Sequence, residues 1–280
     1  MQYAVWFVRL VFVAWMVPAG LNHFVPLFPQ PLGNQPLSRE LFLALIDSRL
    51  FTLVKAVELF AGLCALTGFY VPLALLMCMP VAVCVWYWDV PLQGWDSLSA
   101  IYGWAVLGFT CLMCLTYIRS YLPMLAPLAR PRSLGSSQTP LVGHIVLAAR
   151  IIFGAWLLAN GISHFVTPLL AMPAGHMPLA VQLMTALHNS DLIDVVMAIQ
   201  LVTGALILAG LFLPLALCVV MPISVCAAYW SVILEREPLG ALLGLAAVGL
   251  NALLMVACLE HYRGVLVRRP LALGETEARA

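Results

Sequence analysis

The amino-acid sequence contains one long pattern twice. Shared apolar composition would not align arginine, tryptophan and histidine in the same order, yet Arg9, Trp15 and His23 recur at matching places. The pattern therefore indicates an internal duplication, and each copy is expected to fold into the same unit. The matching segments are residues 3–25 with 144–166, and residues 44–88 with 186–230.

Each copy contains four apolar runs and one short amphipathic segment. The runs are close to the roughly 20 residues that an α-helix needs to cross a bilayer. The short segments, 37–47 and 178–189, follow proline-rich loops and are expected on the membrane surface. We expect Ser48 and Ser190 to cap the second spans at their N-termini, and Gly68 to end the second span of the first copy. The expected spans are 3–22, 49–67, 71–88, 97–118, 143–162, 191–209, 213–234 and 239–259.

The composition places these runs in a lipid bilayer. Hydrophobic residues make up 64% of the 280 residues and charged residues only 9%, against about 25% charged in ordinary soluble domains. Lipid accepts so much apolar surface on the outside of a protein, whereas a soluble fold of this length has no room for it inside. The net charge of +1 and the lack of a basic stripe argue against a nucleic-acid partner. The sequence predicts an all-α integral membrane protein with eight transmembrane helices and the bilayer as its surroundings.

The duplication also predicts the domain organisation and the topology. We expect a first four-helix unit over 1–122, a linker over 123–142, a second unit over 143–266 and a tail over 267–280. Four spans in each unit make the tandem repeats parallel, related by an axis along the membrane normal. Most arginines outside the spans lie in the linker and near the C-terminus. The positive-inside rule then predicts an inner-membrane protein with both termini and the linker in the cytoplasm.

Two charged residues lie within an apolar helix, where charge is costly and indicates function by default. Lys55 is the only lysine of the chain, and Glu58 follows on the same helix face. Glu58 lies roughly 14 Å along the helix axis from its start. The pair is either a proton-handling or ligand-binding site or a structural ion pair. The second copy has Met197 and Gln200 instead, so only the first copy retains the charges.

Histidine and arginine occur at matching places in both copies. His23 and His164 lie at the outer ends of the first spans. They are open to three interpretations: haem ligands, partners of a quinone head group, or interfacial residues that tie the helix to its loop. Arg9 and Arg150 lie nearer the opposite ends, where arginine either reaches phosphate head groups or pairs within the bundle. No spacing predicts a metal site, because the cysteines lie in apolar runs without histidine or acid nearby.

Short motifs in both copies resemble the DoxX family of membrane proteins. The second copy repeats the motifs of the first with Gln200 in place of the glutamate, so the resemblance covers nearly the whole chain. Most members of this family have one unit, and this chain resembles a fused pair. The motifs of the first copy are Arg9, Gly20-Leu-Asn-His23, Glu58-Leu-Phe-Ala-Gly62, Gly68 and Pro72-Leu-Ala74.

The resemblance implies a role at the quinone pool. The family name comes from membrane subunits associated with archaeal terminal quinol oxidase and thiosulfate:quinone oxidoreductase. It implies a membrane subunit of a quinone-linked redox complex, with other subunits as partners, quinone as a ligand and no intrinsic cofactor. The alternatives are a non-catalytic membrane scaffold or assembly factor, and a small-molecule transporter.

The expected site lies in the outer half of the first unit. Glu58, His23 and Lys55 are the candidates for proton exchange, and Trp86 is expected to supply an apolar wall. The candidates for ligand binding are Trp88, Asp89, Arg9, Arg150, His164 and Gln200.

Overall fold

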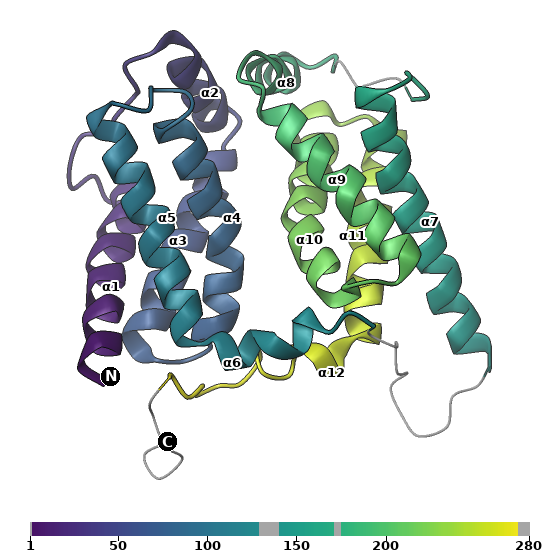
Figure 1. Cartoon of the computed structure of the whole chain (residues 1–280). Helices are drawn as coiled ribbons and strands as arrows, with labels where there is room; N and C mark the ends of the chain where they lie inside the picture. The colour runs from purple at the N-terminus through teal and green to yellow at the C-terminus, as the bar shows by residue number, and fades with distance from the viewer. Residues whose placement is uncertain (1, 129–139, 171–174, 274–280) are drawn as a thin grey trace. The chain divides into compact units, whose positions relative to one another are not determined.

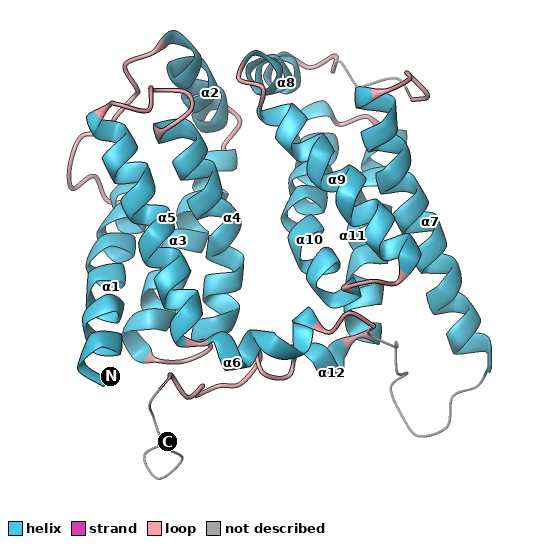
Figure 2. Cartoon of the chain, viewed as in Figure 1, coloured by secondary structure: helices cyan, strands magenta, loops and turns pink. Residues whose placement is uncertain are grey.

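The computed structural model describes residues 2–128, 140–170 and 175–273. Over these residues the chain is helical and has no β-strand (Figure 2). Eight of the described helices are long and apolar enough to cross a membrane. The protein is therefore an all-α polytopic membrane protein, which confirms the fold class predicted from the sequence.

The first compact unit consists of residues 2–122 together with residues 263–273 from the end of the chain (Figure 1). Its four long helices run from one end of the unit to the other, and the short α2 lies at the end opposite the N-terminus. Its helices are α1 (Gln2–Phe24), α2 (Pro36–Asp47), α3 (Leu50–Thr67), α4 (Val71–Asp89), α5 (Leu98–Thr116) and the single-turn α6 (Ile118–Tyr121).

The second compact unit lies between residues 123 and 262. Its elements follow the same order as those of the first unit, so the duplication seen in the sequence is also present in the fold. The elements are the 3₁₀ turn η1 (Leu122–Leu125), α7 (Pro140–Phe165), α8 (Pro178–Asn189), α9 (Leu192–Ala209), α10 (Leu213–Tyr229), its π-helical continuation η2 (Trp230–Glu235), α11 (Pro238–Ala257) and α12 (Leu259–Tyr262).

Glycine allows the first and second spans of each unit to pack closely. A Cβ atom placed on Gly20 of α1 would lie 2.6 Å from the backbone nitrogen of Leu59 on α3. The equivalent Gly161 of α7 packs in the same way on Leu201 of α9. Small residues let transmembrane helices approach so that their backbones are nearly in contact. This packing fixes the face that α3 and α9 turn towards the interior.

Arg9 pairs within the bundle, at the end of α3. Its Nε donates a hydrogen bond to the carbonyl of Ala65, and its Nη2 lies 3.5 Å from the carbonyl of Leu66. These are the last carbonyls before Gly68, which ends α3 in the left-handed conformation (φ 80°) as predicted. A cation is favourable at this negative end of the helix dipole. In the second unit the Arg150 guanidinium likewise lies against the C-cap glycine of α9.

The predicted caps of the second spans are wrong. Ser48 and Ser190 are the C-caps of α2 and α8, and Arg49 and Asp191 are the residues that precede α3 and α9. The Ser48 hydroxyl donates backwards to the carbonyl of Leu45. Because only two residues separate the helices, the serine completes the preceding turn, and the next residue takes a left-handed conformation to redirect the chain.

One tyrosine in each unit links the short helix after the last span to the start of the third span. The Tyr121 hydroxyl donates to the carbonyl of Pro72 at 2.9 Å, and the Tyr262 hydroxyl donates to that of Pro214 at 2.8 Å. Burial raises the pKa of both tyrosines above the ordinary value. Both phenols therefore stay protonated and remain donors at physiological pH.

After its last helix, each copy sends a segment into the opposite unit. In the first unit the carbonyl of Arg268 accepts from the backbone nitrogen of Tyr70 at 3.0 Å, and Ala272 is buried in the core. In the second unit the carbonyl of Pro127 accepts from the nitrogen of Phe212 at 3.0 Å. Residues 263–266 were predicted in the second unit and belong to the first, and Pro127 of the predicted linker belongs to the second. The predicted linker, 123–142, falls largely outside the described residues.

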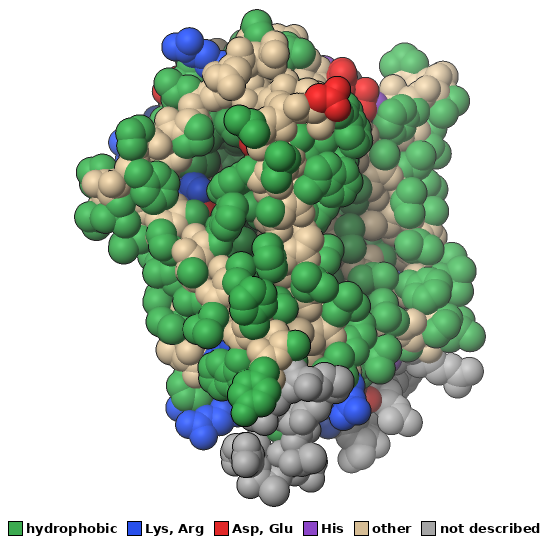
Figure 3. All heavy atoms as spheres, turned by 60° about the vertical axis from the view of Figure 1, so that its left-hand side comes forward, with side chains coloured by type: hydrophobic (Ala, Val, Ile, Leu, Met, Phe, Trp, Pro, Cys, Tyr) green, Lys and Arg blue, Asp and Glu red, His purple; other side chains and the backbone are tan. Residues whose placement is uncertain are grey.

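The described surface suits a lipid environment. Figure 3 shows a broad belt of hydrophobic side chains, with basic side chains near its lower edge. Large apolar residues are openly exposed on the spans, among them Leu98 at 87% and Ile101 at 67%, both on α5. Exposed apolar surface of this extent indicates contact with the lipid bilayer.

Candidate functional site

The first unit buries an ion pair inside a membrane-spanning helix. The Lys55 Nζ lies 2.7 Å from the Glu58 Oε2, and the two side chains are 12% and 5% exposed. The ammonium group also lies 5.0 Å from the centre of the Phe51 ring, one turn earlier on α3. The predicted ion pair therefore forms, and Lys55 is the more exposed of its two side chains.

Aromatic rings connect this pair to the outer end of the unit. The His23 Nε2 of α1 lies 2.9 Å from the hydroxyl of Thr52, and the histidine ring packs edge-on against Phe51 at 5.4 Å. Phe42 of α2 contacts both Phe51, at 4.9 Å, and Trp88 of α4, at 5.4 Å. His23 and Trp88 therefore lie at opposite ends of one continuous aromatic wall above the ion pair.

Tryptophan fixes the short surface helix of each unit. The Trp88 indole donates to the carbonyl of Ser38 on α2 at 2.7 Å. The equivalent Trp230 donates to the carbonyl of Ala180 on α8 at 3.2 Å. The same bond in both copies indicates that this part of Trp88 serves the fold, while its ring remains available to the aromatic wall.

Asp89 is a buried carboxylate without a basic partner among the described residues. It is 3% exposed and lies at the last position of α4. Its Oδ1 accepts from the side-chain amide of Gln93 at 3.2 Å, whereas its Oδ2 has no hydrogen-bond partner in the described structure. The Gln93 Oε1 accepts in turn from the backbone nitrogen of Asn34. The Oδ2 atom of this buried carboxylate can therefore accept a hydrogen bond from a further group.

Tyr102 of α5 packs against α1 in the first unit. Its hydroxyl accepts a hydrogen bond from the Trp15 indole of α1 at 3.2 Å, and the two rings lie 4.5 Å apart. On the face of this unit in Figure 3, basic and acidic side chains lie at the bottom of a hollow rimmed by hydrophobic ones.

The second unit replaces this charged interior with neutral groups. Gln200, equivalent to Glu58, accepts from the side-chain amide of Asn160 at 3.1 Å. At one end of α7 the His164 Nε2 lies 2.6 Å from the Asp194 Oδ1. Asp194 occupies the place of Thr52 and is half exposed. The second unit therefore retains the histidine contact and has neutral residues at the positions of Lys55 and Glu58.

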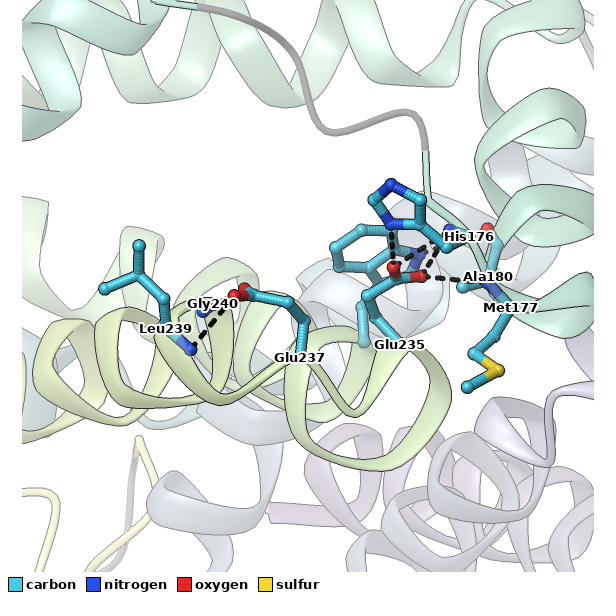
Figure 4. Close-up of polar contacts among 8 residues, drawn as sticks. His176, Met177, Ala180, Glu235, Glu237, Leu239 and Gly240 are labelled. Carbon is cyan, nitrogen blue, oxygen red and sulfur yellow. Dashed lines mark hydrogen bonds and ion pairs between the residues drawn. The ribbon is translucent and has the colours of Figure 1, made fainter.

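Glu235 anchors the outer loop of the second unit (Figure 4). Its carboxylate accepts from the backbone nitrogens of His176 and Met177 and contacts the His176 Nδ1 at 2.7 Å. Glu235 is buried, whereas the His176 side chain is 89% exposed. In the first unit the equivalent residues make the same contact, since the Gln93 side chain accepts from the backbone nitrogen of Asn34. This contact therefore positions a loop in both copies.

The structure brings most of the predicted site together. His23, the pair of Lys55 and Glu58, and Trp88 are linked through Phe51 and Phe42, whereas the hydrogen bond of Asp89 is with Gln93. His164 and Gln200 lie at the matching places of the second unit. Arg9 and Arg150 lie at the far ends of α3 and α9, away from these groups. Ligand binding by any of these residues stays a prediction.

Sequence reasoning missed Tyr102, Gln93 and Asp194. A signal for Gln93 was present, because Glu235 stands at the same offset of 142 residues that relates 44–88 to 186–230. Tyr102 had no such signal, since its contact with Trp15 joins helices that are distant in sequence.

Metal and thiol chemistry finds no support in the described part of the chain. No group of three or more His, Cys, Asp or Glu side chains there is arranged to hold a metal ion. All eight cysteines are free. Burial raises the pKa of the Cys258 thiol to about 11, so this thiol stays protonated and unreactive at neutral pH.

Comparison with known proteins gives no family for this chain. No family model, no curated protein and no solved structure matches it.

Proposed function

We propose that this protein is a membrane subunit of a quinone-linked redox complex, and that its first unit binds the quinone head group. The supporting observation is that three buried or nearly buried charged side chains inside the spans of the first unit have neutral equivalents in the second unit. Because the second unit folds with neutral residues at these positions, the fold itself does not require the charges. The charged residues are Lys55, Glu58 and Asp89, and their neutral equivalents are Met197, Gln200 and Ser231.

The chemistry of the cluster suits a ligand that gains and loses protons. Asp89 has a free carboxylate oxygen with which to exchange a proton with an oxygen atom held beside it. The Glu58 carboxylate, 2.7 Å from the Lys55 ammonium group, is a second proton acceptor in the same unit. The Phe51 and Trp88 rings provide flat apolar surfaces on which an aromatic head group packs. Electrons would come from a partner subunit.

The same proposal includes the family and the orientation. We assign the chain to the DoxX family as a fused pair of its units, on the motifs around Arg9, His23 and Glu58. Both termini lie in the cytoplasm and the protein in the inner membrane, since Arg119, Arg263 and other basic residues follow the last span of each unit.

Mass spectrometry of the gently solubilised protein tests the proposal. The wild type is expected to retain quinone and redox partners. The variant Lys55→Met/Glu58→Gln/Asp89→Ser copies the second unit and is expected to lose the quinone while inserting normally. Met197→Leu/Ser231→Ala changes the second unit without altering charge and serves as the matched control. Partners without quinone in the wild type would favour a scaffold, and unchanged quinone in the triple variant would refute the assigned site.

A further inference from the structure

Asn251 is a fully buried amide without a partner. It lies on α11, about 20 Å along the helix axis from Pro238 at about 1.5 Å per residue, well within a hydrocarbon core of about 30 Å. Its exposure is 0%, and neither its Oδ1 nor its Nδ2 has a hydrogen-bond partner among the described residues. An amide left in this state costs free energy, because no water is available to satisfy it.

The fold does not need an amide at this position. The offset of 141 residues that relates Tyr121 to Tyr262 places Thr110 of α5 opposite Asn251. Thr110 is equally buried, but its hydroxyl donates to the carbonyl of Val106 at 2.8 Å and is satisfied within its own helix. At the equivalent position the first unit therefore buries a polar side chain at a lower cost in free energy, because its hydrogen bond is made.

Other positions on α7, α9 and α10 of the second unit carry uncharged polar side chains where the first unit has alanine. Two of these side chains have partners, since the Thr203 hydroxyl donates to the carbonyl of Ile199 at 2.6 Å and the Asn160 amide donates to Gln200 at 3.1 Å. Asn251 differs from both in that neither of its polar atoms has a partner in the described structure. The polar residues are Asn160, Thr203 and Ser224, and their equivalents in the first unit are Ala19, Ala61 and Ala82.

We propose that the interior of the second unit binds an uncharged, lipid-soluble molecule through a hydroxyl group, with Asn251 as its hydrogen-bond partner. An amide offers both a donor and an acceptor. A hydroxyl group also donates and accepts, so one hydroxyl satisfies both atoms of Asn251. A carbonyl group only accepts and leaves Oδ1 unsatisfied.

This site goes beyond the proposed function, because it lies in the unit that lacks the ionisable cluster. Two sources in a membrane supply the required chemistry, a quinol and a hydroxyl-bearing lipid such as diacylglycerol. The ligand that binds in an Asn251-dependent manner identifies the source.

Thermal unfolding of the full-length protein in detergent micelles tests the inference. The probes are decylubiquinol and dioctanoylglycerol, with decylubiquinone as the probe that carries only carbonyl groups. We expect at least one hydroxyl probe to raise the unfolding temperature of the wild type. If decylubiquinol is the active probe, decylubiquinone should bind roughly tenfold more weakly, because one hydrogen bond is lost and Oδ1 stays unsatisfied.

Asn251→Thr is the matched variant, since the first unit has threonine at this place. Without probe it should unfold at the same temperature as the wild type or higher, because an unpaired buried amide has been removed. With dioctanoylglycerol it should show no shift, and with decylubiquinol it should show only the shift that quinol binding to the first unit contributes. A lower unfolding temperature without probe combined with an unchanged shift would identify Asn251 as a structural residue and overturn the inference. A wild type that no hydroxyl probe stabilises would overturn it as well.

The variant Lys55→Met/Glu58→Gln/Asp89→Ser separates this inference from the proposed function. It should retain the Asn251-dependent shift even though it loses quinone from the first unit. If it retains both, the proposed function fails and this inference stands. If the Asn251-dependent shift disappears in this variant, the hydroxyl site does not belong to the second unit and the inference fails.

Discussion

Lys55→Met is expected to destabilise the protein strongly, because it leaves the Glu58 carboxylate in the interior of the first unit without its counter-ion. The two groups are 2.7 Å apart and only 12% and 5% exposed. Removing one partner of a buried ion pair costs about 3 to 5 kcal/mol. The lysine retains some exposure, so we expect about 3 kcal/mol, at the lower end of that range.

Glu58→Gln should cost less, about 1 kcal/mol, because the amide oxygen still accepts a hydrogen bond from the ammonium group. The double variant reproduces the Met197 and Gln200 of the second unit and should also lie within about 1 kcal/mol of the wild type. The double-mutant cycle therefore predicts a coupling energy of about 3 kcal/mol between Lys55 and Glu58.

Equilibrium unfolding in mixed micelles, with sodium dodecyl sulfate as the denaturant, measures these free energies. The neutral contact between Asn160 and Gln200 provides the control cycle, with Asn160→Ala and Gln200→Leu as single variants. Hydrogen bonds between transmembrane helices average about 0.6 kcal/mol, so its coupling should be several times smaller. A coupling below about 0.5 kcal/mol for Lys55 and Glu58 would show that the buried pair does not form.

Four further predictions follow from the fold. A reporter inserted at residue 135 should read as cytoplasmic, and a periplasmic signal would reverse the assigned topology. Truncation after Tyr262 should lower the unfolding temperature and expose the first unit to proteolysis before the second, because residues 263–273 complete its core; equal protease resistance of the two units would argue against the exchange. Gly20→Ala should destabilise the protein by about 1 to 3 kcal/mol through overpacking against α3, which chemical unfolding would measure. Glu235→Gln should preserve hydrogen-exchange protection of the His176 amide, as the equivalent glutamine does in the first unit, whereas Glu235→Ala should abolish it; equal protection in both variants would exclude this anchor.

The spans could be predicted because lipid imposes a length and a composition that a sequence shows directly. Gly68 was a reliable end signal for α3, since only glycine adopts the left-handed C-cap without strain. Ser48 misled because serine before an apolar run is typical of an N-cap, and nothing local shows that a preceding helix ends there. The segment 263–273 gave no signal at all, because its packing depends on a partner almost two hundred residues earlier.

Some contacts of the candidate site could likewise be predicted from the sequence, and others could not. The contact between Lys55 and Glu58 follows from helical spacing alone, so the sequence predicted it. The contribution of Tyr102 depends on how α5 packs against α1, which no local pattern encodes. Asn251 looked unremarkable in an apolar run, and only the structure shows that both of its polar atoms lack a partner.

The two copies act as controls for each other. Lys55, Glu58 and Asp89 of the first unit and Asn251 of the second each have an equivalent that costs less, and the equivalent is present in the same chain. The packing of α1 on α3 and of α7 on α9 is the same around Gly20 and Gly161, so a difference in this packing does not explain the exchange of Glu58 for Gln200. A cost of several kcal/mol that the fold can avoid, and does avoid in the opposite copy, has to be offset by something bound. The charged interior is suited to a ligand that exchanges protons and the neutral one to a ligand that shares hydrogen bonds, and the two units therefore bind different ligands or different states of one ligand.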